Sequence, residues 1–252
     1  MSDSNSASKT AAARSTAYSP LYQQIKLLLL KSLDQAEWKP GEAIPSELEL
    51  AARFQVSQGT VRKAIDELAA ENLLIRRQGK GTFVSTHNEA KVRYRFLRLT
   101  PDDGHPPTTQ SQIVDCNRRK APAEVARLLG LRNAEAVIYI QRLLSFDGKP
   151  TILDTIWLPA QVFKGMNAEA VHQNREPLYA WFESQFEVSM VRAEESIKAV
   201  AADELTAGYL QVPTGSPLLQ VERVAYTYGE RPMELRRGVY ITDHFHYRNS
   251  LN

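Results

Sequence analysis

Apolar residues recur at helical spacing in three successive segments near the start of the chain. The first segment runs from about Pro20 to Glu37, the second begins after Ser46, and the third begins after Ser57. Ser46 is followed three residues later by Glu49, so each side chain can accept a hydrogen bond from the backbone N–H of the other residue, as in a capping box. Ser57 is the expected N-cap of the third segment. The pattern therefore predicts three helices, with a tight turn between the second and the third.

The third predicted helix has one apolar face and one polar face. Its apolar positions recur at helical spacing and are expected to face inward; they are Val61, Ala64, Ile65 and Leu68. Its first two turns carry short polar or basic residues, namely Gln58, Gly59, Thr60, Arg62 and Lys63. Such residues suit the major groove of DNA, where Gln can pair with adenine and Arg with guanine or a phosphate. Taken alone, the pattern also fits an ordinary amphipathic surface helix with solvated charges.

A short basic hairpin is predicted directly after this helix. Asn72 to Ile75 has the composition of a strand, Arg76 to Gly81 forms a turn with clustered cations and glycines, and Thr82 to Val84 forms the returning strand. Glycine lets the backbone approach a phosphate or the minor groove closely, and the cations neutralise phosphates and release counterions. The order of helix, turn, helix and basic hairpin is that of a winged helix-turn-helix. A basic hairpin that is merely solvated is the alternative.

The chain changes character near Ser85. Ser85 to Lys91 is short, polar and without strong periodicity, which predicts a linker between two domains. After it, strand-like segments dominate; they are Tyr94 to Leu99, Gln110 to Arg118, Ala136 to Phe146, Thr151 to Leu158, Val188 to Ala199, Leu218 to Tyr228 and Met233 to Tyr247. Helices fit at Pro122 to Leu129, Pro177 to Phe186 and Ala202 to Leu210. These patterns predict an α+β domain around an antiparallel sheet, with hairpin turns at Asp147-Gly148 and Tyr228 to Glu230.

Length and charge agree with a modular protein. A chain of 252 residues suits two domains, and an apolar fraction of 43% is sufficient for sizeable cores. The net charge is only +2, so binding to DNA must depend on locally placed cations. The single cysteine, Cys116, rules out an internal disulfide and a cysteine-based zinc cluster.

Several other function classes find little support in the sequence. No apolar run has the length needed to span a bilayer. Residues 1–17 are rich in Ser, Ala and Thr and lack the apolar core of a signal peptide, which predicts a disordered tail on a cytoplasmic protein. His244 and His246 would project to one face of a strand, but no further ligand stands at a suitable spacing, so we expect no metal and no cofactor. Outside the basic turn, no phosphate-cradling glycine loop and no nucleophile–base pair stands out.

Four short motifs follow one another within residues 18–84; they are Pro45-Ser46-Glu47, Val56-Ser57, Thr60-Val61-Arg62 and Gly79 to Val84. In order and spacing they resemble the DNA-binding domain of the GntR superfamily of bacterial transcriptional regulators. The resemblance implies a winged domain over residues 18–84 whose DNA contacts come from Ser46, Ser57, Gln58, Gly59, Thr60, Arg62, Lys63, Arg76, Arg77, Gly79 and Lys80. Many members have Arg where this chain has Leu48 and Gln58, so we expect one phosphate contact to be missing and the base readout to differ.

A second set of short motifs follows in order after the predicted linker: Ala123 to Ala126, Leu129 to Leu131, Arg142, Asp147 to Pro150, Trp157 to Pro159, Pro213, Gly215 to Leu218, Arg231 to Glu234 and Tyr240 to Asp243. From about Val92 to Tyr247 the chain resembles the UTRA effector-binding domain of the HutC-like branch of this superfamily, which implies such a domain over residues 92–252. The resemblance implies a chorismate lyase-like fold with a ligand pocket on the sheet. By position, the effector contacts would come from Thr109, Arg142, Asp154, Glu234 and Tyr240.

The expected pocket residues have complementary chemistry. A guanidinium such as that of Arg142 can clamp a carboxylate or phosphate, whereas a carboxylate accepts hydrogen bonds from hydroxyl or amine groups. The alternative is that Arg142 and Glu234 form a structural ion pair across neighbouring strands. Leu144 stands where sugar-phosphate-binding members often have a second Arg, which puts a phosphosugar effector in doubt.

Together the two resemblances imply a ligand-responsive transcription factor at the bacterial nucleoid. It would be a repressor that binds a pseudo-palindromic operator as a homodimer, with its affinity controlled by a small anionic metabolite. Two other classes stay open, namely an enzyme that uses the chorismate lyase-like domain and a DNA binder without an effector. Turnover of a small molecule would favour the first, and DNA affinity that no ligand changes would favour the second.

Overall fold

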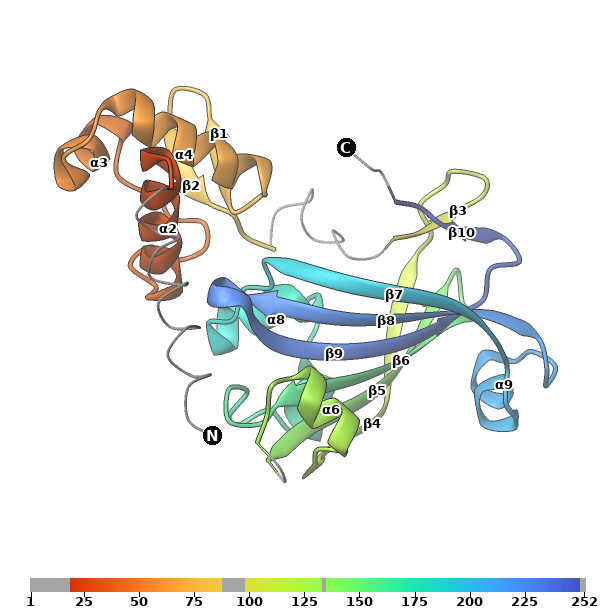
Figure 1. The fold of residues 1–252 in the computed structure, drawn as a ribbon. Helices are drawn as coiled ribbons and strands as arrows, with labels where there is room; N and C mark the ends of the chain where they lie inside the picture. The colour runs from red at the N-terminus through yellow and green to blue at the C-terminus, as the bar shows by residue number, and fades with distance from the viewer. Residues whose placement is uncertain (1–18, 88–97, 133–134, 250–252) are drawn as a thin grey trace, which may run out of the picture. The chain divides into compact units, whose positions relative to one another are not determined.

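The computed structural model describes residues 19–87, 98–132 and 135–249. The chain divides into two compact units, Met1–Thr86 and His87–Asn252, each of which is considered by itself (Figure 1). The predicted tail, most of the predicted linker and most of the predicted strand Tyr94 to Leu99 lie outside the described residues, so the expectations for them stay predictions.

The first unit has the predicted order of three helices and a hairpin. Its elements are α2 (Leu21–Asp34), α3 (Glu47–Phe54), α4 (Gln58–Ala70), β1 (Leu74–Arg77) and β2 (Gly81–Val84). The capping box of Ser46 and Glu49 is complete, and the Ser57 side chain accepts a hydrogen bond from the backbone of Thr60. The apolar face predicted for α4 is fully buried and forms the core of the unit with residues of α2 and α3, including Ile25, Leu29, Leu50 and Ala51. Local capping and periodicity are therefore sufficient to specify this unit.

The hairpin differs from the prediction in the bounds of its strands. The first strand begins at Leu74 rather than Asn72, and it includes Arg76 and Arg77, which were expected in the turn. Asn72 has a φ of 59°, a left-handed conformation that Asn adopts more readily than most residues, and the next N–H closes the helix by donating to the carbonyl of Leu68. Asn72 and Leu73, which were predicted to begin the strand, therefore form the turn that ends helix α4.

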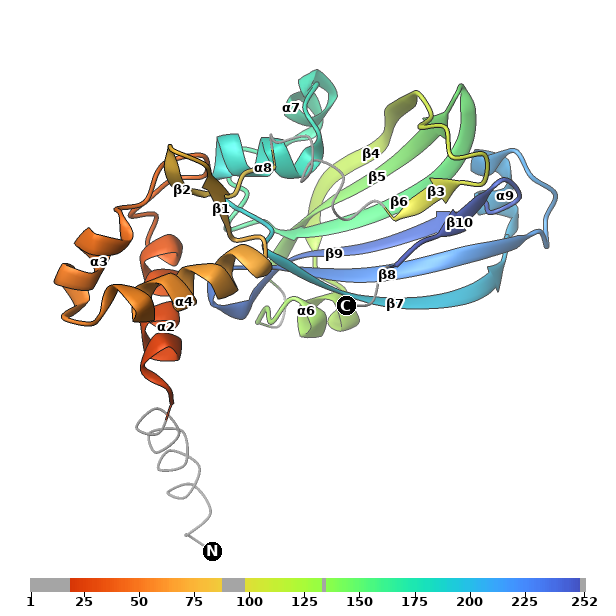
Figure 2. The ribbon, with the colours of Figure 1, turned by 90° about the horizontal axis from the view of Figure 1, so that it is seen from above.

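The second unit is built on one six-stranded antiparallel sheet, with the strand order β4-β5-β6-β9-β8-β7 (Figures 1 and 2). The strands are β4 (Thr109–Lys120), β5 (Ala136–Phe146), β6 (Lys149–Pro159), β7 (Arg192–Ala201), β8 (Pro217–Thr227) and β9 (Arg231–Tyr240). The predicted turns join β5 to β6 and, through the short 3-10 helix η1 (Tyr228–Glu230), β8 to β9. The α+β prediction is confirmed.

Two elements depart from the sequence prediction. The segment predicted as one strand, Met233 to Tyr247, ends its sheet pairing at Tyr240, and its last residues form β10 (Phe245–Tyr247), which pairs with β3 (Leu99–Pro101) in a separate ladder. The intervening residues turn the chain, with Thr242 accepting from the N–H of Phe245. Helix α7 (Ala168–Gln173) was not predicted from the sequence.

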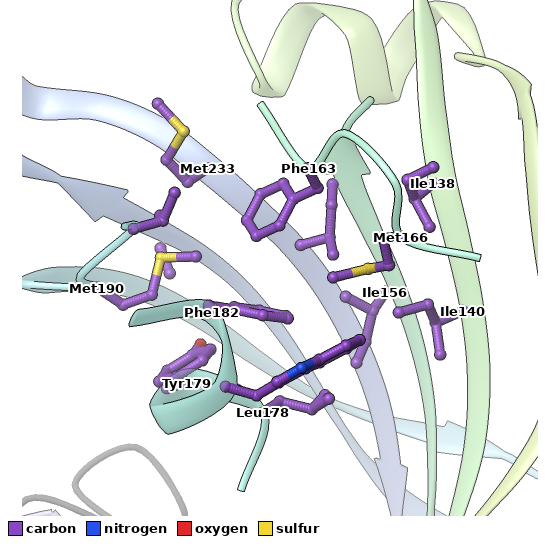
Figure 3. Packing of buried hydrophobic residues seen from close by; sticks show 14 of the residues in the cluster. Ile138, Ile140, Ile156, Phe163, Met166, Leu178, Tyr179, Phe182, Met190 and Met233 are labelled. Carbon is purple, nitrogen blue, oxygen red and sulfur yellow. The ribbon is translucent and has the colours of Figure 1, made fainter. Parts of the chain in front are cut away.

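Helices cover both faces of the sheet, because alternate residues of each strand point in opposite directions. On one face, isoleucines of β5 and β6 pack with α7 and α8 (Leu178–Phe186) around Phe163 and Phe182 (Figure 3). Farther along the same face, Leu144, Ile152 and Tyr240 pack with residues of β3 and β10. The opposite face is covered by α6 (Ala123–Leu128) and α9 (Glu204–Leu210). Polar side chains occupy the first face between its two apolar clusters.

Gly238 on β9 lies in this polar stretch and pairs in register with Asp154 on β6. A Cβ atom on Gly238 would meet the ring of Tyr240 and would lie 2.6 Å from Oδ1 of Asp154. The absent side chain therefore leaves the space that the ring and the carboxylate occupy.

We expect Gly238→Ala to lower the free energy of unfolding by about 1–3 kcal/mol, because the ring of Tyr240 and the carboxylate of Asp154 would have to move. Gly208→Ala is the matched control, because nothing lies within 4 Å of the added Cβ and an alanine inside a helix stabilises it by about 0.5–1 kcal/mol. Denaturant unfolding followed by circular dichroism measures both changes. Unchanged stability of the Gly238 variant would contradict the close packing above this residue.

Candidate functional site

A pocket of about 930 Å³ opens on the face of the sheet between the two apolar clusters. Its floor is formed by side chains of the central strands, and one wall is formed by the end of α7, the connection after it and the start of α8. Four arginines line it: the exposed Arg175 after α7, and three on the sheet, Arg142 on β5, Arg223 on β8 and Arg236 on β9. Since the three sheet arginines are mostly buried, each must be compensated by an acceptor in the protein.

Asp154 is the acceptor at the centre of the floor, and its side chain is 2% exposed. Its Oδ2 atom accepts two hydrogen bonds from Arg142, at 2.8 and 3.0 Å, and a longer one from Arg236 at 3.4 Å. Its Oδ1 atom is buried and has no hydrogen-bond partner among the described residues. A buried carboxylate oxygen without a donor is costly, so Asp154 is only partly compensated by the two arginines.

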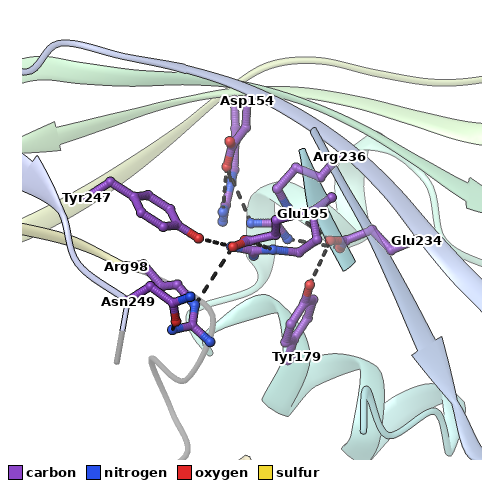
Figure 4. A network of polar contacts seen from close by, with 10 residues as sticks. Arg98, Asp154, Tyr179, Glu195, Glu234, Arg236, Tyr247 and Asn249 are labelled. Carbon is purple, nitrogen blue, oxygen red and sulfur yellow. Dashed lines mark hydrogen bonds and ion pairs between the residues drawn. The ribbon is translucent and has the colours of Figure 1, made fainter. Parts of the chain in front are cut away.

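Glu234 lies behind the floor and is fully buried. It accepts two parallel hydrogen bonds from Arg236, at 2.9 and 3.0 Å, and a third from the hydroxyl of Tyr179 at 2.7 Å (Figure 4). The two parallel bonds fix the plane of the guanidinium. Glu234 therefore positions Arg236 and does not itself line the pocket.

The third arginine belongs to a separate group of polar residues. Nε of Arg223 donates to Glu195 on β7 at 2.6 Å, and the hydroxyl of Tyr247 on β10 donates to the same carboxylate (Figure 4). Glu195 thus connects the sheet to the β3–β10 ladder at the edge of the pocket.

The two central guanidiniums differ in their electrostatic surroundings. Burial lowers the pKa of Arg142, and although Asp154 opposes this effect, the neighbouring charge of Arg236 adds to it. Burial acts in the same direction on Arg236, but the charges of Glu234 and Asp154 and the contact with Tyr179 raise its pKa well above the ordinary value. Arg142 is therefore the less compensated cation of the two, and it would gain more from a bound anion.

Tyr240 supplies a neutral group at the pocket wall. Burial, followed by the charge of Asp154, raises the pKa of its phenol to about 12. The hydroxyl is therefore protonated at neutral pH and can donate a hydrogen bond.

Four of the five residues predicted for the effector site line this pocket, namely Thr109, Arg142, Asp154 and Tyr240. Glu234, the fifth, lies one layer behind. The pair of Arg142 with Glu234, considered as a structural alternative, is replaced by two pairs in which Arg142 contacts Asp154 and Glu234 contacts Arg236. Sequence reasoning missed Arg236, although its position two residues after Glu234 places it on the same face of a strand.

In the first unit, the residues predicted to contact DNA gather around the start of α4 and the hairpin. Two of them, Ser46 and Ser57, use their hydroxyls as helix caps, and Thr60 lies 2.9 Å from the hydroxyl of Ser57. Lys63 lies over the ring of Tyr22. In the hairpin, Gly79 has a φ of 69°, and Arg77 and Lys80 are exposed; Gly59, in the first turn of α4, is exposed as well.

One carboxylate, that of Glu47, holds the polar side chains of this surface in place. It accepts hydrogen bonds from Nε of Arg62 on α4 at 2.9 Å and from Nη1 of Arg76 on β1 at 2.8 Å, and Gln58 lies within 3.4 Å. Arg76 also contacts Asp66. Sequence reasoning used Glu47 only as part of a motif and assigned it no role, because its two arginine partners lie 15 and 29 residues away.

Comparison with known proteins identifies both units. Residues 21–84 match the family described as bacterial regulatory proteins of the gntR family, and residues 106–246 match the UTRA domain. The chain belongs to the GntR family of DNA-binding transcriptional regulators and carries a UTRA domain. Within the described residues, no group of three or more His, Cys, Asp or Glu side chains could hold a metal ion, and none of the described helices is long and apolar enough to cross a membrane.

Individual relatives agree with this assignment. The chain is 28% identical over 219 residues to the "Probable fructoselysine utilization operon transcriptional repressor" of Escherichia coli (strain K12), covering 85% of this chain and 88% of the relative. It is 25% identical over 224 residues to the histidine utilization repressor of Pseudomonas putida, covering 88% of each.

A solved structure resembles the second unit. It is the ligand-binding domain of a protein from Bordetella bronchiseptica described as a GntR-family transcriptional regulator, with 54% identity and a TM-score of 0.62 over 63% of this chain and 99% of that one.

We expect Glu234→Gln to lower the free energy of unfolding of the UTRA domain by about 3–5 kcal/mol, because it leaves the buried guanidinium of Arg236 without its main counter-charge. Glu222→Gln, which weakens a partly exposed pair with Arg237, is the control and should have a far smaller effect. Calorimetric melting measures both. Equal melting temperatures for the two variants would contradict a positioning role of Glu234.

Proposed function

We propose that this regulator represses transcription by binding a pseudo-palindromic operator as a homodimer, in the cytoplasm at the bacterial nucleoid. The observation that supports it most is the exposed basic surface at the start of α4, next to a hairpin with glycines at positive φ. One recognition helix contacts only a few base pairs, so two copies related by a two-fold axis supply the specificity and impose symmetry on the operator.

On this proposal, Arg62 reads bases and the hairpin contacts phosphates. Arg62 is more than half exposed and is anchored at its Nε atom by Glu47, which leaves N–H groups on its terminal nitrogens for further contacts. Those nitrogens can contact guanine or a phosphate.

We expect Arg62→Ala to cost on the order of 1–3 kcal/mol of specific binding, and Lys80→Ala to weaken binding to all sequences and to reduce the salt slope by about 1. An operator obtained by in vitro selection, titrated at several salt concentrations against a scrambled duplex, separates the two effects. Unchanged operator affinity for Arg62→Ala would refute the role assigned to α4.

We further propose that a small anionic metabolite binds the pocket of the UTRA domain and changes the affinity for the operator. Its anionic group would lie against Arg142, the less compensated guanidinium, and a hydroxyl or amine beside it would donate to the carboxylate of Asp154. A phosphorylated ligand would also meet Arg223 and Arg236, which line the same pocket, and this supports such a ligand although Leu144 offers no cation.

A thermal-shift screen against anionic metabolites tests this assignment, because a ligand at 100 times its Kd stabilises the native state by about 2.7 kcal/mol. We expect Arg142→Ala to abolish the shift given by any hit. Lys149→Ala is the control, since it removes an exposed cation next to the β5–β6 turn and should leave the shift intact. A hit that shifts wild type and Arg142→Ala equally would place its site elsewhere.

A further inference from the structure

We propose that helix α8 connects the pocket to His87, the first residue of the second unit. Ligand binding in the pocket would then change the strength of the contacts that hold the chain at His87. The role of this connection in regulation rests on the proposed function, whereas the contacts that form it do not. The path runs from Arg236 through Glu234 and Tyr179 to Glu183 and His87.

The pocket end of the path is a buried set of charged hydrogen bonds. Arg236 lines the pocket, Glu234 holds it with two bonds, and Tyr179 donates its hydroxyl to the same carboxylate. Figure 4 shows Arg236 and Tyr179 meeting at Glu234 from the sheet and from α8. Because Glu234 is fully buried, no water is available to replace a donor that moves away. A ligand that draws Arg236 toward itself therefore changes the bond that holds Tyr179.

The far end of the path lies one helical turn along α8. Glu183 follows Tyr179 by four residues, and its Oε2 atom accepts a hydrogen bond from the backbone N–H of His87 at 2.8 Å. The same oxygen lies 2.9 Å from Nδ1 of His87. The imidazole also contacts Tyr179 directly, with ring centroids 5.5 Å apart and planes at 81°. His87 is thus held by two residues of one rigid helix, and one of these residues also belongs to the pocket network.

The contact between His87 and Glu183 leaves some of its buried polar atoms without hydrogen bonds to the described residues. His87 and Glu183 are both more than nine-tenths buried. Yet Nε2 of His87 and Oε1 of Glu183 have no hydrogen-bond partner among the described residues. Unsatisfied buried polar atoms make the closed arrangement less favourable than a fully paired one, so a small change at Tyr179 is sufficient to shift the balance.

Residue-resolved hydrogen exchange by NMR on the full chain tests the path without knowledge of the effector or the operator. Tyr179→Phe removes only the hydroxyl that α8 shares with Glu234. Since the loss of one buried hydrogen bond to a charged group is worth about a factor of ten or more, we expect the amide of His87 to exchange about tenfold faster in this variant. Arg236→Lys, which perturbs the path from the pocket side, should accelerate the same amide.

Tyr226→Phe is the matched control, because its hydroxyl donates to the exposed carboxylate of Glu194 and takes no part in the path. It should leave the exchange at His87 unchanged. Amides of helix α9, which packs in a different apolar cluster, report on local openings away from the path and should exchange at wild-type rates in all variants. Unchanged exchange at His87 in both Tyr179→Phe and Arg236→Lys would overturn the proposal. So would equal acceleration at His87 and in α9, because it would show a general loss of stability rather than a local connection.

Discussion

The second unit depends on the pairing of guanidiniums with carboxylates inside a sheet face that is otherwise apolar. Burying a charge without a partner is prohibitive, and here Asp154 and Glu234 stand within hydrogen-bond distance of Arg142 and Arg236. The pairs interrupt the packing between the isoleucine cluster under α8 and the cluster under the β3–β10 ladder. That interruption is the pocket, so the same residues that are costly to bury create the place where a ligand can bind.

The first unit also pairs arginines with a carboxylate, in this case at its surface. Glu47 compensates Arg62 and Arg76 from two different elements and so fixes their orientation. Side chains that are already ordered lose less entropy on binding. In both units a carboxylate that does not itself face the ligand determines where the arginines point.

Local signals were sufficient for the DNA-binding unit and for most of the sheet. The serine caps of α3 and α4 and the turn at Asp147-Gly148 depend only on residues close together in the sequence. Each was found where the sequence predicted it. The β1 boundary was wrong because Asn72 belongs to the helix ending, a choice that depends on the carbonyl of Leu68 being free to accept.

For the pocket, the sequence predicted which strands line it but not which carboxylate pairs with which arginine. The partner of Glu234 is set by which side chains share a face and by the approach of α8 through Tyr179, 55 residues away in the chain. Arg236 could have been found by the period of two within its strand, whereas the contact of His87 with Glu183, separated by 96 residues, left no signal in the sequence.

The central claim is that one small molecule and one operator are linked through this chain, and linkage requires that the coupling be reciprocal. The most direct measurement is isothermal titration of a pocket ligand into the free protein and into its operator complex, together with operator titration in the presence and absence of the ligand. We expect the ligand to change the operator Kd, and the operator to change the ligand Kd by the same factor. A ligand that binds with equal affinity to the free protein and to the operator complex would contradict it.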